Sequence, residues 1–135
     1  MHTTNYINTF IEIAEDSATQ TAEIPPQKGD KQTAANVQFD MIIAHPYRYT
    51  SDDVLFHVFA TKNNKTDNLT SERELFFSKG QPCFRASPLT KRYGWGLHSD
   101  AEGKIALYPA ESAEYQQFLK DDTLQKVKAM RSKRT

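Results

Sequence analysis

Cysteine is almost absent from this chain, and long apolar runs are missing. Cys83 is the only cysteine, so no disulfide can form within the chain. No apolar stretch approaches the roughly 20 residues that a membrane-crossing helix needs. Residues 1–10 lack the basic start and the apolar run of a secretory signal peptide. Together these absences predict a protein of the cytoplasm.

The composition is otherwise that of a folded protein. Hydrophobic residues make up 38% of the 135 residues and aromatic residues 11%, which favours a packed core over disorder and a single domain over residues 1–135. Seventeen basic residues balance 17 acidic ones, and a net charge of zero argues against a field that would attract nucleic acid to the whole molecule.

The charges are unevenly distributed along the chain. Residues 1–75 hold 6 basic and 11 acidic side chains, a difference of −5, whereas residues 76–135 hold 11 basic and 6 acidic ones, a difference of +5. This pattern allows a local basic face built from the second half. The alternative, which we favour, is that the two halves neutralise each other in the fold or across a dimer.

The first half of the chain predicts one strand, a long loop and two helices. The run around Phe10 is rich in β-branched and aromatic residues and predicts a strand, while residues 17–32 show no periodic apolar face and predict a long loop. Apolar residues at helical spacing predict a helix over residues 34–44, which Pro46 should end. Residues 51–59 fit a helix capped by Thr50 or Ser51, or else a buried strand.

The middle of the chain predicts a helix followed by a β-hairpin. Ser71 and Glu74 have the spacing of a capping box, and Gly80 stands where a helix commonly ends in a glycine. Two alternating segments joined by a short glycine-containing turn predict a hairpin over residues 93–108.

The last quarter predicts two more helices and a basic tail. Residues 111–120 place aromatic and aliphatic side chains on one helical side, residues 122–130 predict a last short helix, and residues 131–135 form a basic C-terminal tail. The predicted fold is therefore α+β: a small antiparallel sheet that includes the 93–108 hairpin, with helices packed on one face.

Two of the five glycines flank the only tryptophan, Trp95. On a strand, Gly94 and Gly96 would share one face with His98, leaving bare backbone beside an imidazole. Glycine in a strand often marks close approach by a ligand or by another part of the chain. This face is either an open floor for a ligand or is covered by an aromatic ring such as that of Tyr108. We favour the second alternative, packing within the chain.

Basic and aromatic residues near these glycines suggest a binding surface. The candidate ligand-binding residues are Arg48, Arg85, Lys91, Arg92, Trp95 and His98, with Gly94 and Gly96 as an open floor. They predict a binding protein for a small anionic or nucleotide-like ligand or for a protein partner, and a homo-oligomer stays open. No glycine-rich phosphate loop is present.

The sequence offers two alternatives to binding, a small enzyme and an association with nucleic acid, and argues against a metal site. Cys83 and His98 could form a nucleophile and base in a small enzyme, although a lone cysteine is more often a buried apolar residue. The four histidines are scattered and no pair has i, i+4 spacing, so neither a metal nor a cofactor is predicted. The basic tail could associate weakly with nucleic acid, although such tails are usually only solvated.

Five segments of the chain carry a resemblance to a known family: HTTNYINTFIEIAED, HPYRYTSDDVLF, FFSKGQPCFRASPL, KRYGWGLHSDAEGKIALY and KAMRSKRT. The chain resembles, over essentially its whole length, a family of small bacterial proteins that carry a single domain of unknown function. The resemblance implies a complete bacterial cytosolic protein to which the basic tail belongs. It implies no activity, cofactor or catalytic residue.

Overall fold

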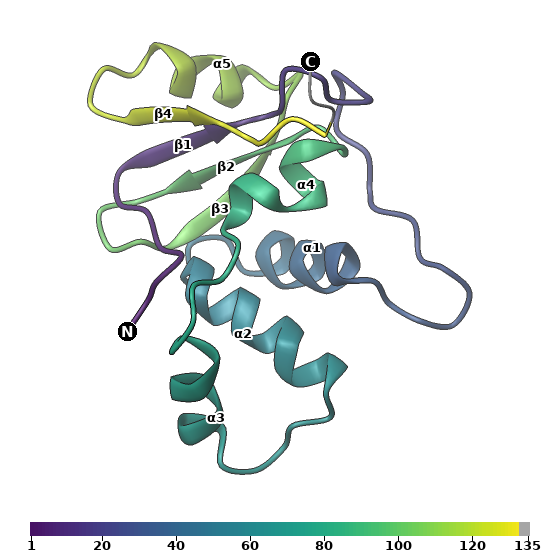
Figure 1. Ribbon diagram of the computed structural model, residues 1–135. Helices are drawn as coiled ribbons and strands as arrows, with labels where there is room; N and C mark the ends of the chain where they lie inside the picture. The colour runs from purple at the N-terminus through teal and green to yellow at the C-terminus, as the bar shows by residue number, and fades with distance from the viewer. Residues whose placement is uncertain (133–135) are drawn as a thin grey trace.

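The protein has an α+β fold, seen in a computed structural model that describes residues 1–132 (Figure 1). Its elements, in chain order, are β1 (Thr9–Glu12), α1 (Ala34–Ala44), α2 (Ser51–Lys62), α3 (Leu69–Phe76), the 3-10 turn η1 (Phe84–Ala86), α4 (Pro88–Lys91), β2 (Trp95–Ser99), β3 (Ile105–Pro109), α5 (Ala113–Lys120) and β4 (Gln125–Lys128). Among the described residues, no helix is long and apolar enough to cross a membrane.

The four strands form one mixed sheet in the order β3-β2-β1-β4. The predicted hairpin is confirmed: β2 and β3 pair antiparallel, with Leu97 opposite Leu107. β1 pairs antiparallel with β2 and parallel with β4. The helix predicted over residues 122–130 is therefore wrong, because the backbone of residues 125–128 bonds to β1, with the Gln125 N–H donating to the Asn8 carbonyl. Long-range pairing overrides the local helical pattern here.

Helices lie on both faces of the sheet rather than on one. The main core packs α1, α2 and α4 against one face, where Ile11, Trp95 and Leu97 point. α5 covers part of the other face, where Tyr115 packs edge-on against Phe10 at 5.0 Å between ring centres. Figure 1 shows α5 beside β4, on the far side of the sheet from α1 and α2. The alternation of side chains along β1 and β2 separates these two cores.

Residues 51–62 form a helix, so the alternative of a buried strand is excluded. Thr50 is the N-cap: its hydroxyl accepts from the Asp53 N–H while the Asp53 carboxylate accepts from the Thr50 N–H. Capping of this kind satisfies N–H groups that have no partner inside the helix.

α3 begins earlier than predicted and does not end at a glycine. Its N-cap is Asn68, with Ser71 inside the helix, and its C-cap is Phe77. Gly80 lies beyond the end and is not among the glycines with positive φ. The predicted capping box at Ser71 and the predicted C-terminal role of Gly80 are therefore wrong.

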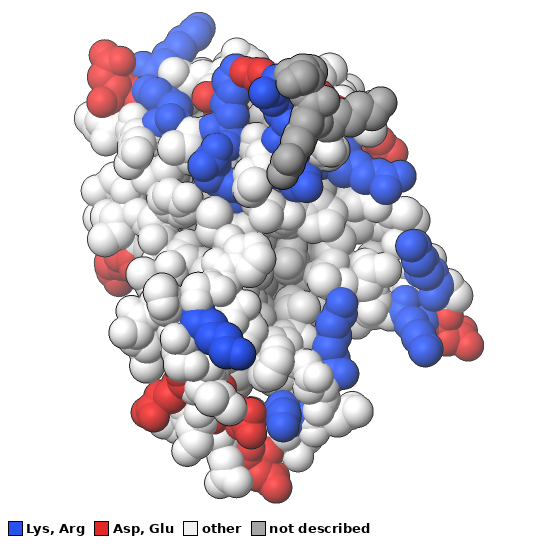
Figure 2. Space-filling model, in the orientation of Figure 1, with Lys and Arg blue, Asp and Glu red and all other residues white. Residues whose placement is uncertain are grey.

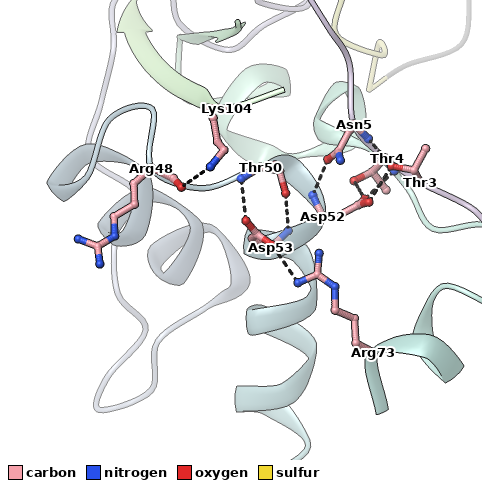
Figure 3. A network of polar contacts seen from close by, with 9 residues as sticks. All are labelled: Thr3, Thr4, Asn5, Arg48, Thr50, Asp52, Asp53, Arg73 and Lys104. Carbon is pink, nitrogen blue, oxygen red and sulfur yellow. Dashed lines mark hydrogen bonds and ion pairs between the residues drawn. The ribbon is translucent and has the colours of Figure 1, made fainter. Parts of the chain in front are cut away.

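The N-terminal residues are fastened to the start of α2 by a buried carboxylate. The Asp52 side chain accepts hydrogen bonds from the Thr3 hydroxyl, the Thr4 hydroxyl and the Thr4 N–H, at 2.6 to 2.7 Å (Figure 3). The Asn5 side chain in turn accepts from the Asp52 N–H. Only 8% of Asp52 is exposed, and its carboxylate anchors the N-terminal residues. Asp52 also lies in the first turn of α2, where a negative charge stabilises a helix.

Candidate functional site

A pocket of about 350 Å³ opens where the start of α1 faces α4. This volume lies within the range of small-molecule sites. We call it the basic pocket, and its lining residues are Pro26, Lys28, Thr33, Ala34, Ala35, Ala86, Pro88, Lys91, Arg92, Tyr93 and Ser132. Three of them are cationic, and no Asp or Glu of residues 1–132 lines the pocket.

The start of α1 contributes partial positive charge to this pocket. Thr33 caps the helix through its hydroxyl, which accepts from the Asn36 N–H, and the Asn36 side chain accepts from the Thr33 N–H. Ala34 and Ala35 form the first turn and line the pocket. The N–H groups of a first helical turn have no partners inside the helix and favour an anion.

The cations come from two segments that are distant in sequence. Lys91 and Arg92 end the one-turn helix α4, which Ser87 caps and in which Leu89 and Thr90 are buried. That anchoring leaves Lys91 half-buried and Arg92 exposed at the mouth of the pocket, with the Arg92 guanidinium 5.6 Å from the centre of the Tyr93 ring. Lys28, in the 17–32 segment, lines the same pocket. None of the ion pairs found among the described residues involves these three cations.

The wall of the pocket that carries Lys28 is held by residues near the lone tryptophan. The Trp95 indole N–H donates to the Glu23 carbonyl at 2.8 Å, and the Glu23 N–H donates to the Tyr93 carbonyl at 2.9 Å. From the other side, the Asn36 amide donates to the Pro25 carbonyl. Residues 17–32 contain neither helix nor strand, yet the part next to the pocket is bonded to both β2 and α1.

The two glycines beside Trp95 do not form an open floor; the alternative that the sequence favoured, close packing, is what the structure has. Gly94 has φ +78°, and a side chain there would place its first carbon 2.6 Å from the Thr21 carbonyl oxygen. A side chain on Gly96 would reach within 2.6 Å of the rings of Phe10 and Tyr115. The rings that cover Gly96 come from β1 and α5, not from Tyr108. Both glycines permit close packing within the chain.

Of the six other candidate residues, Lys91 and Arg92 line the basic pocket. Trp95 is 8% exposed and packs on Phe39 in the main core. Arg48 lies in the α1–α2 connection, where its carbonyl accepts from the Lys104 ammonium (Figure 3). Neither of these two side chains lines the pocket.

Arg85 lines a neighbouring pocket of about 280 Å³, together with Glu15, Lys128, Ala129, Met130 and Arg131. Its Nε donates to the Lys128 carbonyl, and Lys128 forms an exposed ion pair with Glu15 at 3.1 Å. Figure 2 shows basic side chains gathered over β4 and α4, with some acidic side chains among them. Of the predicted basic tail, residues 133–135 lie outside the described residues.

His98 belongs to a separate cluster on the α5 face of the sheet. Its Nδ1 lies 2.9 Å from the Tyr47 hydroxyl, which lies 2.7 Å from the Tyr108 hydroxyl, and the imidazole stacks on Phe118 with ring centres 4.4 Å apart. Burial lowers the pKa of His98, although Asp100 and Asp121 act in the opposite direction. Burial and the hydrogen bond with Tyr108 raise the pKa of Tyr47. The imidazole is therefore neutral near pH 7.

Cys83 contacts Tyr6 and not His98. Its sulfur lies 3.4 Å from the Tyr6 hydroxyl, and burial together with this contact raises the pKa of Tyr6. No hydrogen bond among the described residues joins Cys83 to His98, so the geometry does not assemble a nucleophile and base from them. No group of three or more His, Cys, Asp and Glu side chains in residues 1–132 could hold a metal ion.

Comparison with known proteins gives one match. A family model described as "Family of unknown function (DUF6157)" matches residues 1–135. The chain belongs to this family. No curated protein and no solved structure matches it.

In this DUF6157 protein, the sequence pointed to Lys91 and Arg92 but not to the other side of the basic pocket, which Lys28 and the start of α1 form. Lys28 lies in the segment predicted only as a loop, and the cap formed by Thr33 and Asn36 is a threonine followed three residues later by a side-chain acceptor. That spacing is a helix-start signal and could have pointed to the N-terminal end of α1 as an anion site. Nothing local in the sequence brings Lys28 to Lys91.

Proposed function

We propose that this protein binds a small anionic or nucleotide-like ligand in the basic pocket, in the bacterial cytoplasm. The observation that carries the proposal is the arrangement of Lys28, Lys91 and Arg92 around the start of α1, without a carboxylate among the described lining residues. Like charges repel one another, and an anion bound between them relieves that repulsion while hydrogen-bonding to the guanidinium.

The rest of the lining favours a ligand that is more than a bare ion. Pro26, Ala34, Ala35, Ala86 and Pro88 provide apolar contact area, and Tyr93 adds an aromatic ring at the side where Arg92 lies. Small-molecule sites commonly combine such apolar walls with a few fixed polar groups. An aromatic ring that carries a phosphate or carboxylate group matches both parts of the pocket.

A thermal-shift comparison tests this proposal. The probes are adenosine monophosphate, inorganic phosphate and uncharged adenosine, each added in excess to the whole protein. A ligand that binds only the folded state raises the melting temperature in proportion to RT ln(1 + [L]/Kd). We expect the largest rise with adenosine monophosphate, a smaller one with phosphate, and none with adenosine.

Two double variants locate the effect. Lys91→Met with Arg92→Met removes two cations from the pocket and should abolish the rise. Arg48→Met with Lys79→Met removes the same charges from exposed positions outside the pocket and should leave the rise intact. A rise in melting temperature that survives the first pair of substitutions would place the ligand elsewhere. A rise that disappears equally in both double variants would mean that net charge alone causes it.

A further inference from the structure

The chain between residues 26 and 32, which we call the Lys28 turn, stands apart from the rest of the fold. All of its residues are exposed, and none belongs to a hydrophobic core of the described chain. A side chain on Gly29 would meet no described atom within 4 Å, apart from those of its chain neighbours. Figure 1 shows this part of the connection into α1 projecting from the body of the protein. The turn therefore contributes little to the packing that stabilises the fold.

Few hydrogen bonds hold the Lys28 turn in place. Within it, the Lys31 N–H donates to the Lys28 carbonyl at 3.2 Å, and Gly29 between them has φ +63°. Among the described residues, the one hydrogen bond that joins the turn to another part of the fold runs between two exposed side chains: the Gln32 amide donates to the Asp40 carboxylate at 3.0 Å. Such a bond adds little stability, because water competes for both of its groups.

Both ends of the turn are fixed by one buried side chain, that of Asn36, which is 7% exposed. Its amide N–H₂ donates to the Pro25 carbonyl at 2.8 Å, just before the turn, and its side-chain carbonyl accepts from the Thr33 N–H at 2.9 Å, just after it. A backbone carbonyl can only accept and a backbone N–H can only donate, so these two partners fix the orientation of the Asn36 amide. The Lys28 turn is thus a loop with a fixed base and an exposed tip.

Charge couples the turn to the basic pocket. Lys28 lines the pocket together with Lys91 and Arg92, and it takes part in none of the ion pairs found in residues 1–132. Asp30, the carboxylate of the turn, takes part in none of them either and does not line the pocket. The three like charges repel one another. An anion placed among them attracts all three, so it reverses the direction of the force on Lys28.

We propose that the Lys28 turn is a lid: an anionic ligand in the basic pocket draws Lys28 inward, and the turn closes over the ligand about its base at Asn36. This inference rests on the proposed function, because the same anion supplies the attraction. Segments that close over ligands come from the least stable parts of a fold, and a few residues at their ends absorb the change in backbone angles. A closed turn excludes water from the anionic group and so strengthens its contacts with the cations.

Trypsin, which cuts after lysine and arginine, tests for closure at Lys31. Lys31 belongs to the turn but does not line the pocket, so a ligand in the pocket shields it only if the turn itself moves. The whole protein is digested with adenosine monophosphate or adenosine in excess, and mass spectrometry follows each cut. We expect adenosine monophosphate to slow cleavage after Lys31 roughly tenfold, in proportion to the closed fraction, and adenosine to leave it unchanged. Cleavage after Lys65, in the exposed loop between α2 and α3, is the internal reference and should not change.

Lys28→Gln separates closure from binding. Lys91 and Arg92 still attract the phosphate group in this variant, so adenosine monophosphate should raise the melting temperature by a smaller amount but should no longer slow cleavage after Lys31. Lys79→Gln, which changes an exposed lysine outside the pocket, should keep the protection.

The results separate the lid from the proposed function. A rise in the melting temperature of the wild-type protein without slower cleavage after Lys31 would overturn the lid and leave the anion site standing. Slower cleavage that persists in Lys28→Gln would overturn the lid as well. The absence of any rise with adenosine monophosphate or phosphate would overturn both.

Discussion

Gly96 on β2 lies directly against the ring of Phe10 on β1. A first side-chain carbon on Gly96 would fall 2.5 Å from the Phe10 Cζ atom, closer than real side chains approach one another. His98, two residues along, is the register partner of Phe10 on the neighbouring strand. The absence of a side chain at Gly96 therefore creates the space in which the smaller core, between the sheet and α5, is packed.

Gly96→Ala should destabilise the protein by about 1 to 3 kcal/mol, because the added methyl group forces the rings of Phe10 and Tyr115 to move. Urea denaturation measures the free energy of unfolding. Gly80→Ala is the control: its new carbon would lie 3.8 Å from the His2 ring, an ordinary contact, and stability should stay the same or rise by up to about 1 kcal/mol. Equal losses in the two variants would contradict the packing described here.

Asp52→Asn should loosen the N-terminal segment. The variant retains the shape of the side chain but sets an N–H₂ group against donors from Thr3 and Thr4, and a loss of about 1 to 3 kcal/mol in the free energy of unfolding is expected. Asp40→Asn changes an exposed carboxylate and should stay within about 0.5 kcal/mol of the wild type. If both variants unfold at the same urea concentration, Asp52 is not an anchor.

His98 should make the stability of the protein depend on pH. Burial lowers its pKa in the folded state below the ordinary value of about 6.5, so the unfolded chain takes up a proton more readily than the folded protein. The stability that the protein has while His98 is neutral is fully present above pH 6.5, and it is lost as the pH falls toward the folded-state pKa.

His98→Gln removes that titration. Urea denaturation at pH 7.5 and pH 5.5 should show a smaller loss of stability on acidification in the variant than in the wild type. An unchanged pH dependence would mean that the imidazole is as easily protonated in the folded protein as in the unfolded chain.

The parts of the fold that the sequence predicts are those set by local patterns. Proline at residue 46, the threonine cap at residue 50 and the turn between β2 and β3 all act within a few residues, and the elements they bound were predicted. Strand β4 was missed because its partner β1 lies more than 100 residues away in the chain. A four-residue strand that depends on such a partner leaves little local signal.

The candidate site shows the same division. Lys91 and Arg92 were identified from their own segment, since a basic pair beside an aromatic residue is visible in the sequence. Lys28 was not, because its place opposite them depends on hydrogen bonds from Trp95 and Asn36 to the backbone of residues 23–25. The question of whether Gly94 and Gly96 were open or covered was likewise decided by segments distant in sequence, namely Thr21, Phe10 and Tyr115.

The most direct test of an anion site in the basic pocket is an NMR titration of the ¹⁵N-labelled protein with adenosine monophosphate. The chemical shifts of the backbone amides monitor the binding. The account predicts saturable shifts that are largest at Lys28, at Ala34 and Ala35, and at Lys91 to Tyr93. Shifts centred on His98 and Tyr108, or shifts that rise without saturation over all basic residues, would contradict it.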